Sequence, residues 1–187
     1  MPADCSPRFV ASDNTSGICP EALEYLLKAI IPVAEEEQVQ MGLHPDDPSF
    51  NVRGRPRIVK DGAALQRVVA IVPSASNGIT FCPGSLATNR RNDIMDIAEK
   101  LWPHFIYCHF RNIRFLSEEE LDGEWAFLET YHEDEKGAVQ LAPLLKLLHE
   151  KGCKVPYRAD HAPGMYGHDA NFGYGLVARA QGLSFLQ

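Results

Sequence analysis

The stretch Lys154-Val155-Pro156-Tyr157-Arg158-Ala159-Asp160-His161 has the pattern of a short strand that ends in charged side chains. Successive side chains of a strand point to opposite faces, so Arg158 and Asp160 share one face while Tyr157 and Ala159 share the other. A strand that ends in arginine, aspartate and histidine is a plausible catalytic element. The alternative is structural: the aspartate caps the next helix and the arginine is its ion-pair partner.

Three earlier segments end in a similar way, which favours the catalytic interpretation. They are predicted as strands, and each delivers a side chain that binds metals: Val39–His44, Gly78–Cys82 and Phe105–Phe110, the last through His109. Prolines stop the first two strands, since proline removes a backbone donor. In the third strand, alternation predicts that Phe105, Tyr107 and His109 share a face.

Helical patterns separate these strands. Apolar residues recur at helical spacing from Pro20 to about Glu37, over Asp61–Val72, Asp93–Leu101 and Val139–Lys151, and from about Gly175 onward. An acidic excursion over residues 112–135 interrupts the alternation and contains a predicted short strand, Phe127–Thr130. Strands that alternate with helices at this spacing predict an α/β fold with a parallel sheet. Residues 1–18 are polar and irregular, which predicts a flexible arm ahead of one domain over 19–187.

The composition of the chain indicates which kinds of binding partner and which cellular compartment to expect. The chain has 187 residues and a net charge of −7, which argues against nucleic acid, because phosphate binding needs a basic surface. No apolar run approaches the roughly 20 residues that span a bilayer, so no membrane partner is expected. The N-terminus lacks a signal-peptide pattern, and the five cysteines are widely spaced, so we expect reduced thiols and a cytoplasmic location.

The four strand ends together predict a metal site. In a parallel barrel the carboxyl ends of the strands converge on one mouth, where we expect His44, Cys82, His109 and Asp160 to meet. Two imidazoles, a thiolate and a carboxylate form a credible divalent site, and these ligand types suit Zn²⁺ or Fe²⁺. Taken singly, each residue has a structural alternative, such as a buried core thiol for Cys82.

Several motifs resemble the mannonate dehydratase family, in that family's order and at its approximate spacing. They are His44-Pro45-Asp46-Asp47-Pro48, Thr80-Phe81-Cys82-Pro83-Gly84-Ser85, His109-Phe110-Arg111-Asn112, Phe127-Leu128-Glu129-Thr130-Tyr131-His132, Arg158-Ala159-Asp160-His161 and Gly173-Tyr174. The resemblance covers about residues 21–187. It implies a partial TIM-like (β/α) barrel of about four parallel βα units, corresponding to the second half of an eight-unit barrel.

The resemblance also implies a reaction: dehydration of D-mannonate to 2-keto-3-deoxy-D-gluconate in hexuronate (glucuronate) catabolism, with one Mn²⁺ or Fe²⁺. Carried over by position, the metal ligands are His44, Cys82, His109 and Asp160. His161 and Tyr174 are the implied acid and base, in an order that stays open. The residues implied to line the substrate are Arg111, Asn112, Glu129, His132 and Arg158.

The implied chemistry agrees with the residue types. Loss of a proton beside a carboxylate creates an enediolate, whose charge a divalent metal stabilises. Two alternatives remain. One is a non-catalytic remnant or interaction module that keeps the scaffold; the other is a sugar isomerase, against which the thiolate ligand argues. A half barrel exposes two strand edges, which predicts that two copies associate.

Overall fold

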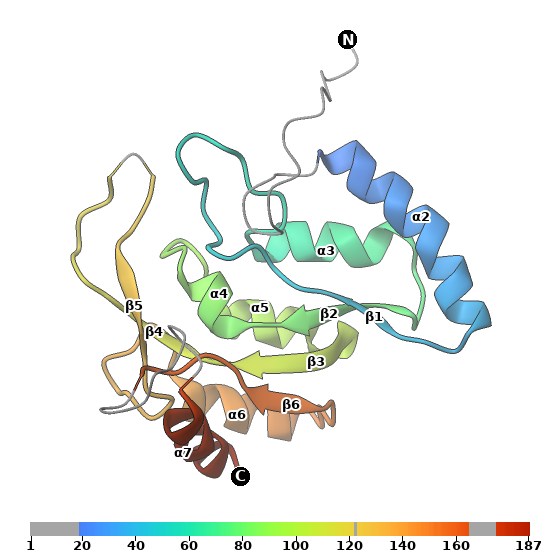
Figure 1. Ribbon diagram of the computed structural model, residues 1–187. Helices are drawn as coiled ribbons and strands as arrows, with labels where there is room; N and C mark the ends of the chain where they lie inside the picture. The colour runs from blue at the N-terminus through green and yellow to red at the C-terminus, as the bar shows by residue number, and fades with distance from the viewer. Residues whose placement is uncertain (1–18, 122, 165–174) are drawn as a thin grey trace.

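The structure is a computed structural model that describes residues 19–121, 123–164 and 175–187. Helices and strands alternate through most of it (Figure 1). Their bounds are α2 (Pro20–Glu36), β1 (Met41–Leu43), α3 (Gly62–Ile71), β2 (Asn77–Phe81), α4 (Pro83–Ala87), α5 (Ile94–Leu101), η1 (Trp102–His104), β3 (Phe105–Phe110), β4 (Asn112–Phe115), β5 (Phe127–Thr130), α6 (Leu141–Glu150), β6 (Tyr157–Ala159) and α7 (Leu176–Leu186). The predicted arm over 1–18 lies outside the described residues.

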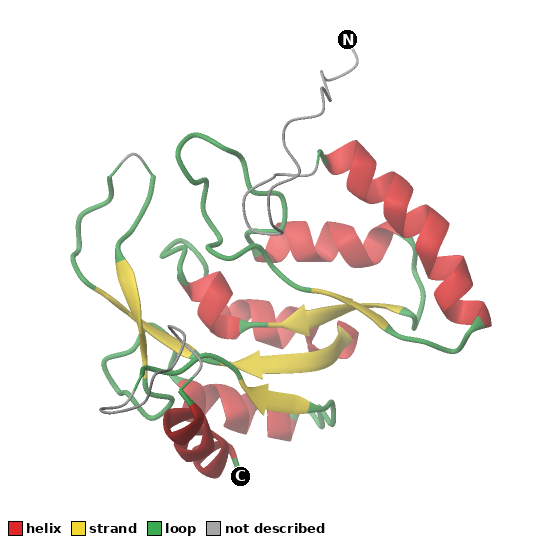
Figure 2. Ribbon diagram, viewed as in Figure 1, coloured by secondary structure: helices red, strands yellow, loops and turns green. Residues whose placement is uncertain are grey.

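The main sheet is parallel throughout and has the strand order β1-β2-β3-β6. In Figure 2 the strand arrows of β2, β3 and β6 point the same way, and in Figure 1 helices α3, α5 and α6 lie behind the sheet. The predicted α/β class with a parallel sheet is confirmed. Because all strands run in one direction, their carboxyl ends lie along one edge of the sheet, as the metal-site hypothesis requires.

The core lies between the sheet and these helices. Leu65 of α3 and Ile79 of β2 have no exposed surface, and Phe81 stacks on Phe105 with ring centroids 4.3 Å apart. Local signals start the helices: the side chain of Asp61 accepts a hydrogen bond from the backbone of Ala64, 2.7 Å away, and caps α3. The apolar residues whose spacing predicts α3 therefore lie on the face that the helix buries.

The Phe105–Phe110 strand corrects one prediction. Phe105 does not share the face of Tyr107 and His109, because its ring is buried in the core beside Phe81, whereas both other side chains are only half buried. The pairing register between β2 and β3 shifts at Ile79 and Thr80, an irregularity of the bulge type. A bulge inserts one residue and so reverses the alternation on one side of it.

Two further elements were not predicted from the sequence. Pro83-Gly84-Ser85 was interpreted only as a stop, but Pro83 begins the short helix α4, because proline fits the first turn of a helix. The acidic excursion contains β4 in addition to β5, and the two form a separate antiparallel ribbon that pairs Ile113 with Glu129. This ribbon rises beside the carboxyl end of β3 (Figure 1). The predicted strand Phe127–Thr130 is confirmed.

Two strands of the main sheet, β1 and β6, are shorter than predicted, β2 begins and ends one residue earlier, and β3 has the predicted bounds. β1 covers Met41–Leu43, so His44 follows the strand, and Cys82 and Asp160 likewise stand one residue beyond β2 and β6. Within the described residues, no helix has both the length and the apolar character needed to cross a membrane.

Replacement of Leu65 by alanine should lower the free energy of unfolding by about 2–5 kcal/mol, because the truncation leaves a cavity in the closed core. The matched control is Leu116→Ala, whose side chain is 61% exposed and whose loss should cost within about 0.5 kcal/mol. Urea denaturation followed by circular dichroism measures both. Equal losses in the two variants would contradict the placement of α3 in the core.

Candidate metal and substrate site

Three of the predicted metal ligands converge at the carboxyl end of the sheet. One ligand atom each from His44, Cys82 and His109 lies within 4.8 Å of the other two. The rings of the two histidines are tilted to each other, with centroids 5.1 Å apart. The three side chains come from or directly follow β1, β2 and β3, so adjacent parallel strands bring together residues that are far apart in sequence.

His44 is oriented by its own turn. Its Nδ1 lies 2.6 Å from the carbonyl oxygen of Pro45, a distance at which an Nδ1–H donates and Nε2 keeps its lone pair. Burial lowers the pKa of His44, although that hydrogen bond and the Asp47 charge act in the opposite direction. A neutral ring with a fixed tautomer is the form in which histidine binds a metal.

Cys82 is fully buried, and its Sγ lies 3.0 Å from the hydroxyl oxygen of Ser85. Burial raises the pKa of the Cys82 thiol to about 11, although the positive charge of Arg111 lowers it. At neutral pH the side chain is therefore a thiol. A metal ion that binds here displaces its proton, because the thiolate is the ligand.

Asp160 stands next to this group of three. Its Oδ2 lies 3.9 Å from His109 Nδ1, and its Oδ1 accepts a hydrogen bond from Arg158 Nη2 at 2.6 Å. The carboxylate is not within 4.8 Å of all three of the other ligand atoms, so the group of three does not include it. Burial raises the pKa of Asp160, but His161, His109 and Arg158 outweigh burial and hold the pKa below its usual range. Burial lowers the pKa of His109 to about 4. The carboxylate is thus ionised beside a neutral imidazole.

His161 belongs to a chain of contacts behind the ligands. Its Nδ1 lies 3.3 Å from Glu129 Oε1, and the same carboxylate oxygen lies 3.0 Å from Arg111 Nη2. An Nδ1–H at this distance can donate to Glu129 and so orient the ring of His161. The β4–β5 ribbon, which sequence reasoning only half predicted, is what brings Glu129 to this position.

The other predicted site residues differ in how far they are buried. Arg158 is exposed on β6, whereas Arg111, Asn112 and His132 are buried. Each of the three buried side chains has at least one polar atom in contact with the protein, although Arg111 Nε and His132 Nδ1 have no hydrogen-bond partner among the described residues. Asn112 Oδ1 accepts from the backbone of Val139 at 2.9 Å, and His132 Nε2 lies 2.9 Å from the carbonyl oxygen of Phe110. These contacts favour a supporting role for the buried residues. Tyr174 lies outside the described residues.

Sequence reasoning missed two polar residues of this region, Asp47 and Ser85. Asp47 forms a short ion pair with Arg111, and Ser85 contacts Cys82. Both stand three residues after a predicted ligand, and this shared spacing is the sequence feature from which they could have been predicted as site residues.

The donor set fits a divalent transition metal. Sulfur and imidazole nitrogen are the ligands that such ions prefer, and separations of at most 4.8 Å bring the three atoms near the distances at which one ion could bind them all with bond lengths of about 2.0–2.3 Å. His44, Cys82 and His109 would hold the ion, and Asp160 is the nearby carboxylate.

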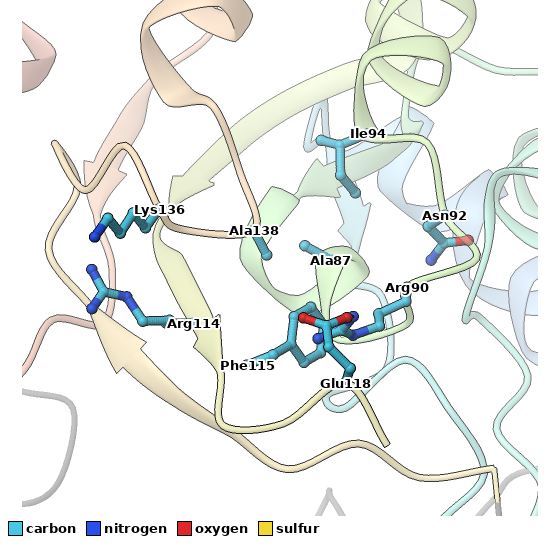
Figure 3. Close-up of a pocket in the computed structure, with 9 residues that line it drawn as sticks. All are labelled: Ala87, Arg90, Asn92, Ile94, Arg114, Phe115, Glu118, Lys136 and Ala138. Atoms are coloured by element: carbon cyan, nitrogen blue, oxygen red, sulfur yellow. The ribbon is translucent and has the colours of Figure 1, made fainter. Parts of the chain in front are cut away.

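A separate hollow of about 390 Å³ lies between the end of α4, the start of α5, the end of β4 and the loop that precedes α6 (Figure 3). None of the site residues is among its described lining residues. It is basic, but Arg114 pairs with Asp134 outside it, and Arg90 pairs with Glu118 and covers the ring of Phe115. Two of the cations in its lining are thus paired within the protein, and we assign no chemistry to it.

Comparison with known proteins agrees with this geometry. The profile of the D-mannonate dehydratase (UxuA) family matches residues 15–187. This chain belongs to the D-mannonate dehydratase family. A mannonate dehydratase of Enterococcus faecalis is 40% identical over 167 residues, which are 89% of this chain and 45% of the relative. The crystal structure of mannonate dehydratase from Streptococcus suis superimposes with a TM-score of 0.78 at 35% identity, over 91% of this chain and 49% of that one.

A more distant structure supports the fold alone. A xylose isomerase-like TIM barrel protein from Mycobacterium smegmatis superimposes with a TM-score of 0.61 at 13% identity. Both structural neighbours are about twice as long as the matched region, and the chain spans about half the length of the mannonate dehydratases that it matches.

The raised pKa of Cys82 predicts how metal binding varies with pH. His44 and His109 are already neutral at pH 7, since their pKa values are lowered, and Cys82 alone must lose a proton. The dissociation constant for Co²⁺ should therefore fall about tenfold from about pH 7 to about pH 8, because rising pH increases the thiolate fraction. Titrations followed by absorbance measure it.

The control is Cys82→Ala, in which residual Co²⁺ binding should no longer vary with pH in this range. A dissociation constant of the unchanged chain that stays constant with pH would contradict ligation by Cys82.

Proposed function

We propose that this chain carries the metal-binding part of a D-mannonate dehydratase, a cytoplasmic enzyme of glucuronate catabolism that forms 2-keto-3-deoxy-D-gluconate. The observation that supports it most directly is the convergence of His44, Cys82 and His109 in a member of this family. We propose Mn²⁺ or Fe²⁺ as the ion and Asp160 as the fourth ligand. In this proposal the sheet is the second half of a (β/α)8 barrel.

The reaction breaks the C2–H bond and the C3–O bond and releases water; the resulting enol then rearranges to the 2-keto acid. A bound divalent ion would supply positive charge to the enediolate that forms when the C2 proton leaves. The remaining tasks are proton transfers and orientation, which belong to the side chains around the ligands.

His161 is suited to one of the proton transfers. Glu129 contacts its Nδ1 and orients the ring, and its Nε2 lies 4.0 Å from Asp160 Oδ2, beside the proposed ligands. Tyr174 is proposed for the other transfer, and which of the two acts on C2 stays open. Exposed Arg158, beside Asp160, is placed to attract the carboxylate of a sugar acid. Glu129 is the second proposed substrate contact. We propose that the buried residues Arg111, Asn112 and His132 stabilise the site without contacting the substrate.

The proposal predicts metal-dependent turnover of D-mannonate. The purified chain with Mn²⁺ should form the keto-deoxy acid, detected by proton NMR, and His161→Ala should lower kcat by at least about 100-fold through the loss of acid–base catalysis. The matched control is His149→Ala, an exposed histidine at the end of α6. Bound metal without any product would instead support the alternative function, a non-catalytic module that keeps the scaffold.

We also propose that two copies associate through the open sides of the sheet. Within the described residues β1 and β6 each pair on one side only, and nearby helices expose apolar side chains: Leu26 and Val33 on α2, and Leu176 and Val177 on α7. Unpaired edges with adjacent apolar surface favour association. Two four-stranded sheets would complete eight strands.

Light scattering after size-exclusion chromatography should therefore give twice the chain mass of 20.8 kDa. Leu176→Glu should shift the mass toward the monomer, because the charge would have to be buried in the interface. Leu116→Glu, at an exposed site away from both edges, is the control. A monomer for the unchanged chain would contradict this proposal.

A further inference from the structure

Arg111 is a buried cation with partners on three segments. Its side chain is 2% exposed, directly after β3. Nη1 forms a short ion pair with Asp47 and lies 3.4 Å from Ser85 Oγ, while Nη2 lies 3.0 Å from Glu129 Oε1. These partners come from the loop after β1, from α4 after β2, and from β5. One guanidinium group thus joins three chain segments that are remote in sequence.

Each partner leads to a residue of the proposed site. Ser85 Oγ is 3.0 Å from Cys82 Sγ, and Glu129 Oε1 is 3.3 Å from His161 Nδ1. Asp47 stands three residues after His44 in the same turn. Arg111 is therefore one contact away from the sulfur ligand and from the proposed proton-transfer residue, and it anchors the segment of a second ligand.

The backbone nearby leaves room for this arginine. A Cβ atom on Gly84 would lie 2.2 Å from Arg111 Cγ and 2.9 Å from the Arg111 carbonyl oxygen. Separations this short do not occur between non-bonded atoms, so any larger residue at position 84 would displace the guanidinium or α4. Gly84 thus allows the close approach between α4, which carries Ser85, and the arginine.

Stability alone does not explain why a charge is buried here. Removing a guanidinium group from water costs free energy, and apolar residues of similar volume often serve stability as well as a buried ion pair does. In addition, Arg111 Nε and Glu129 Oε2 are buried without a hydrogen-bond partner among the described residues. What arginine adds is a planar, rigid set of donors that fixes several acceptors at once.

We propose that Arg111 is a positioning residue for the metal site and that Ser85 transmits its effect to Cys82. Arg111 fixes the positions of the Ser85 hydroxyl group and the Glu129 carboxylate. The hydroxyl group then orients the Cys82 sulfur, and the carboxylate orients the His161 ring. The inference rests on the proposed metal site and assigns Arg111 a task other than direct contact with substrate.

The test is a titration of the full chain with Co²⁺, whose sulfur-to-cobalt charge-transfer band and d–d bands report on the geometry of the ligands. Ser85→Ala and Arg111→Lys should each weaken Co²⁺ binding about 10- to 100-fold, the usual effect of losing a group that orients a ligand. Both should also change the absorption bands. Arg67→Lys, at an exposed arginine of α3, should leave affinity and spectrum unchanged.

Far-UV circular dichroism establishes whether the variants are folded. If Arg111→Lys does not fold, Ser85→Ala decides, because it removes one hydroxyl group and leaves every charge in place. Gly84→Ala offers a second route, since it displaces Arg111 without removing its charge, and it should change the bands in the same direction.

The two proposals fail in different ways. The metal site stands if the unchanged chain shows the charge-transfer band and Cys82→Ala abolishes this band. If, in that case, Ser85→Ala and Arg111→Lys match the unchanged chain in affinity and spectrum, the positioning role of Arg111 is refuted. If the unchanged chain shows no charge-transfer band, the site itself is refuted, and the role of Arg111 with it.

Discussion

The parallel pairing of β1, β2, β3 and β6 is the constraint on which the rest of this structure depends. Parallel strands end at the same edge of a sheet, so the residues that follow them become neighbours whatever their separation in sequence. His44, Cys82 and His109 lie up to 65 positions apart in the chain and meet within 4.8 Å for this reason. The helices behind the sheet maintain the pairing by burying its apolar face.

The electrostatics of the site follow from its burial. Desolvation lowers the pKa of both histidines and raises that of the thiol, which keeps all three groups uncharged near neutral pH. The carboxylate of Asp160 stays ionised because cationic and titratable neighbours outweigh its own burial. The result is a site with neutral donors and one adjacent negative charge, which a cation would complement.

The four proposed ligands all lie within a chain that spans about half of each mannonate dehydratase to which it is similar. A centre built from consecutive strands needs only those strands for its geometry. Turnover is a different matter, because among the described residues β1 and β6 each pair on one side only and α2 and α7 expose apolar side chains. Metal binding and turnover are therefore separate predictions for this chain.

The alternation of strands and helices, and the strand ends at which His44, Cys82 and His109 meet, could be predicted from sequence, because apolar periodicity and proline stops are local signals. The start of α4 could not, since Pro83 is equally suited to stopping a strand and to opening a helix. The bulge that turns Phe105 into the core depends on pairing with another strand. Arg111 shows the difference most clearly. A charged residue in a sequence is expected at the surface, and only the tertiary structure supplies Asp47, Ser85 and Glu129 as partners for the buried guanidinium group.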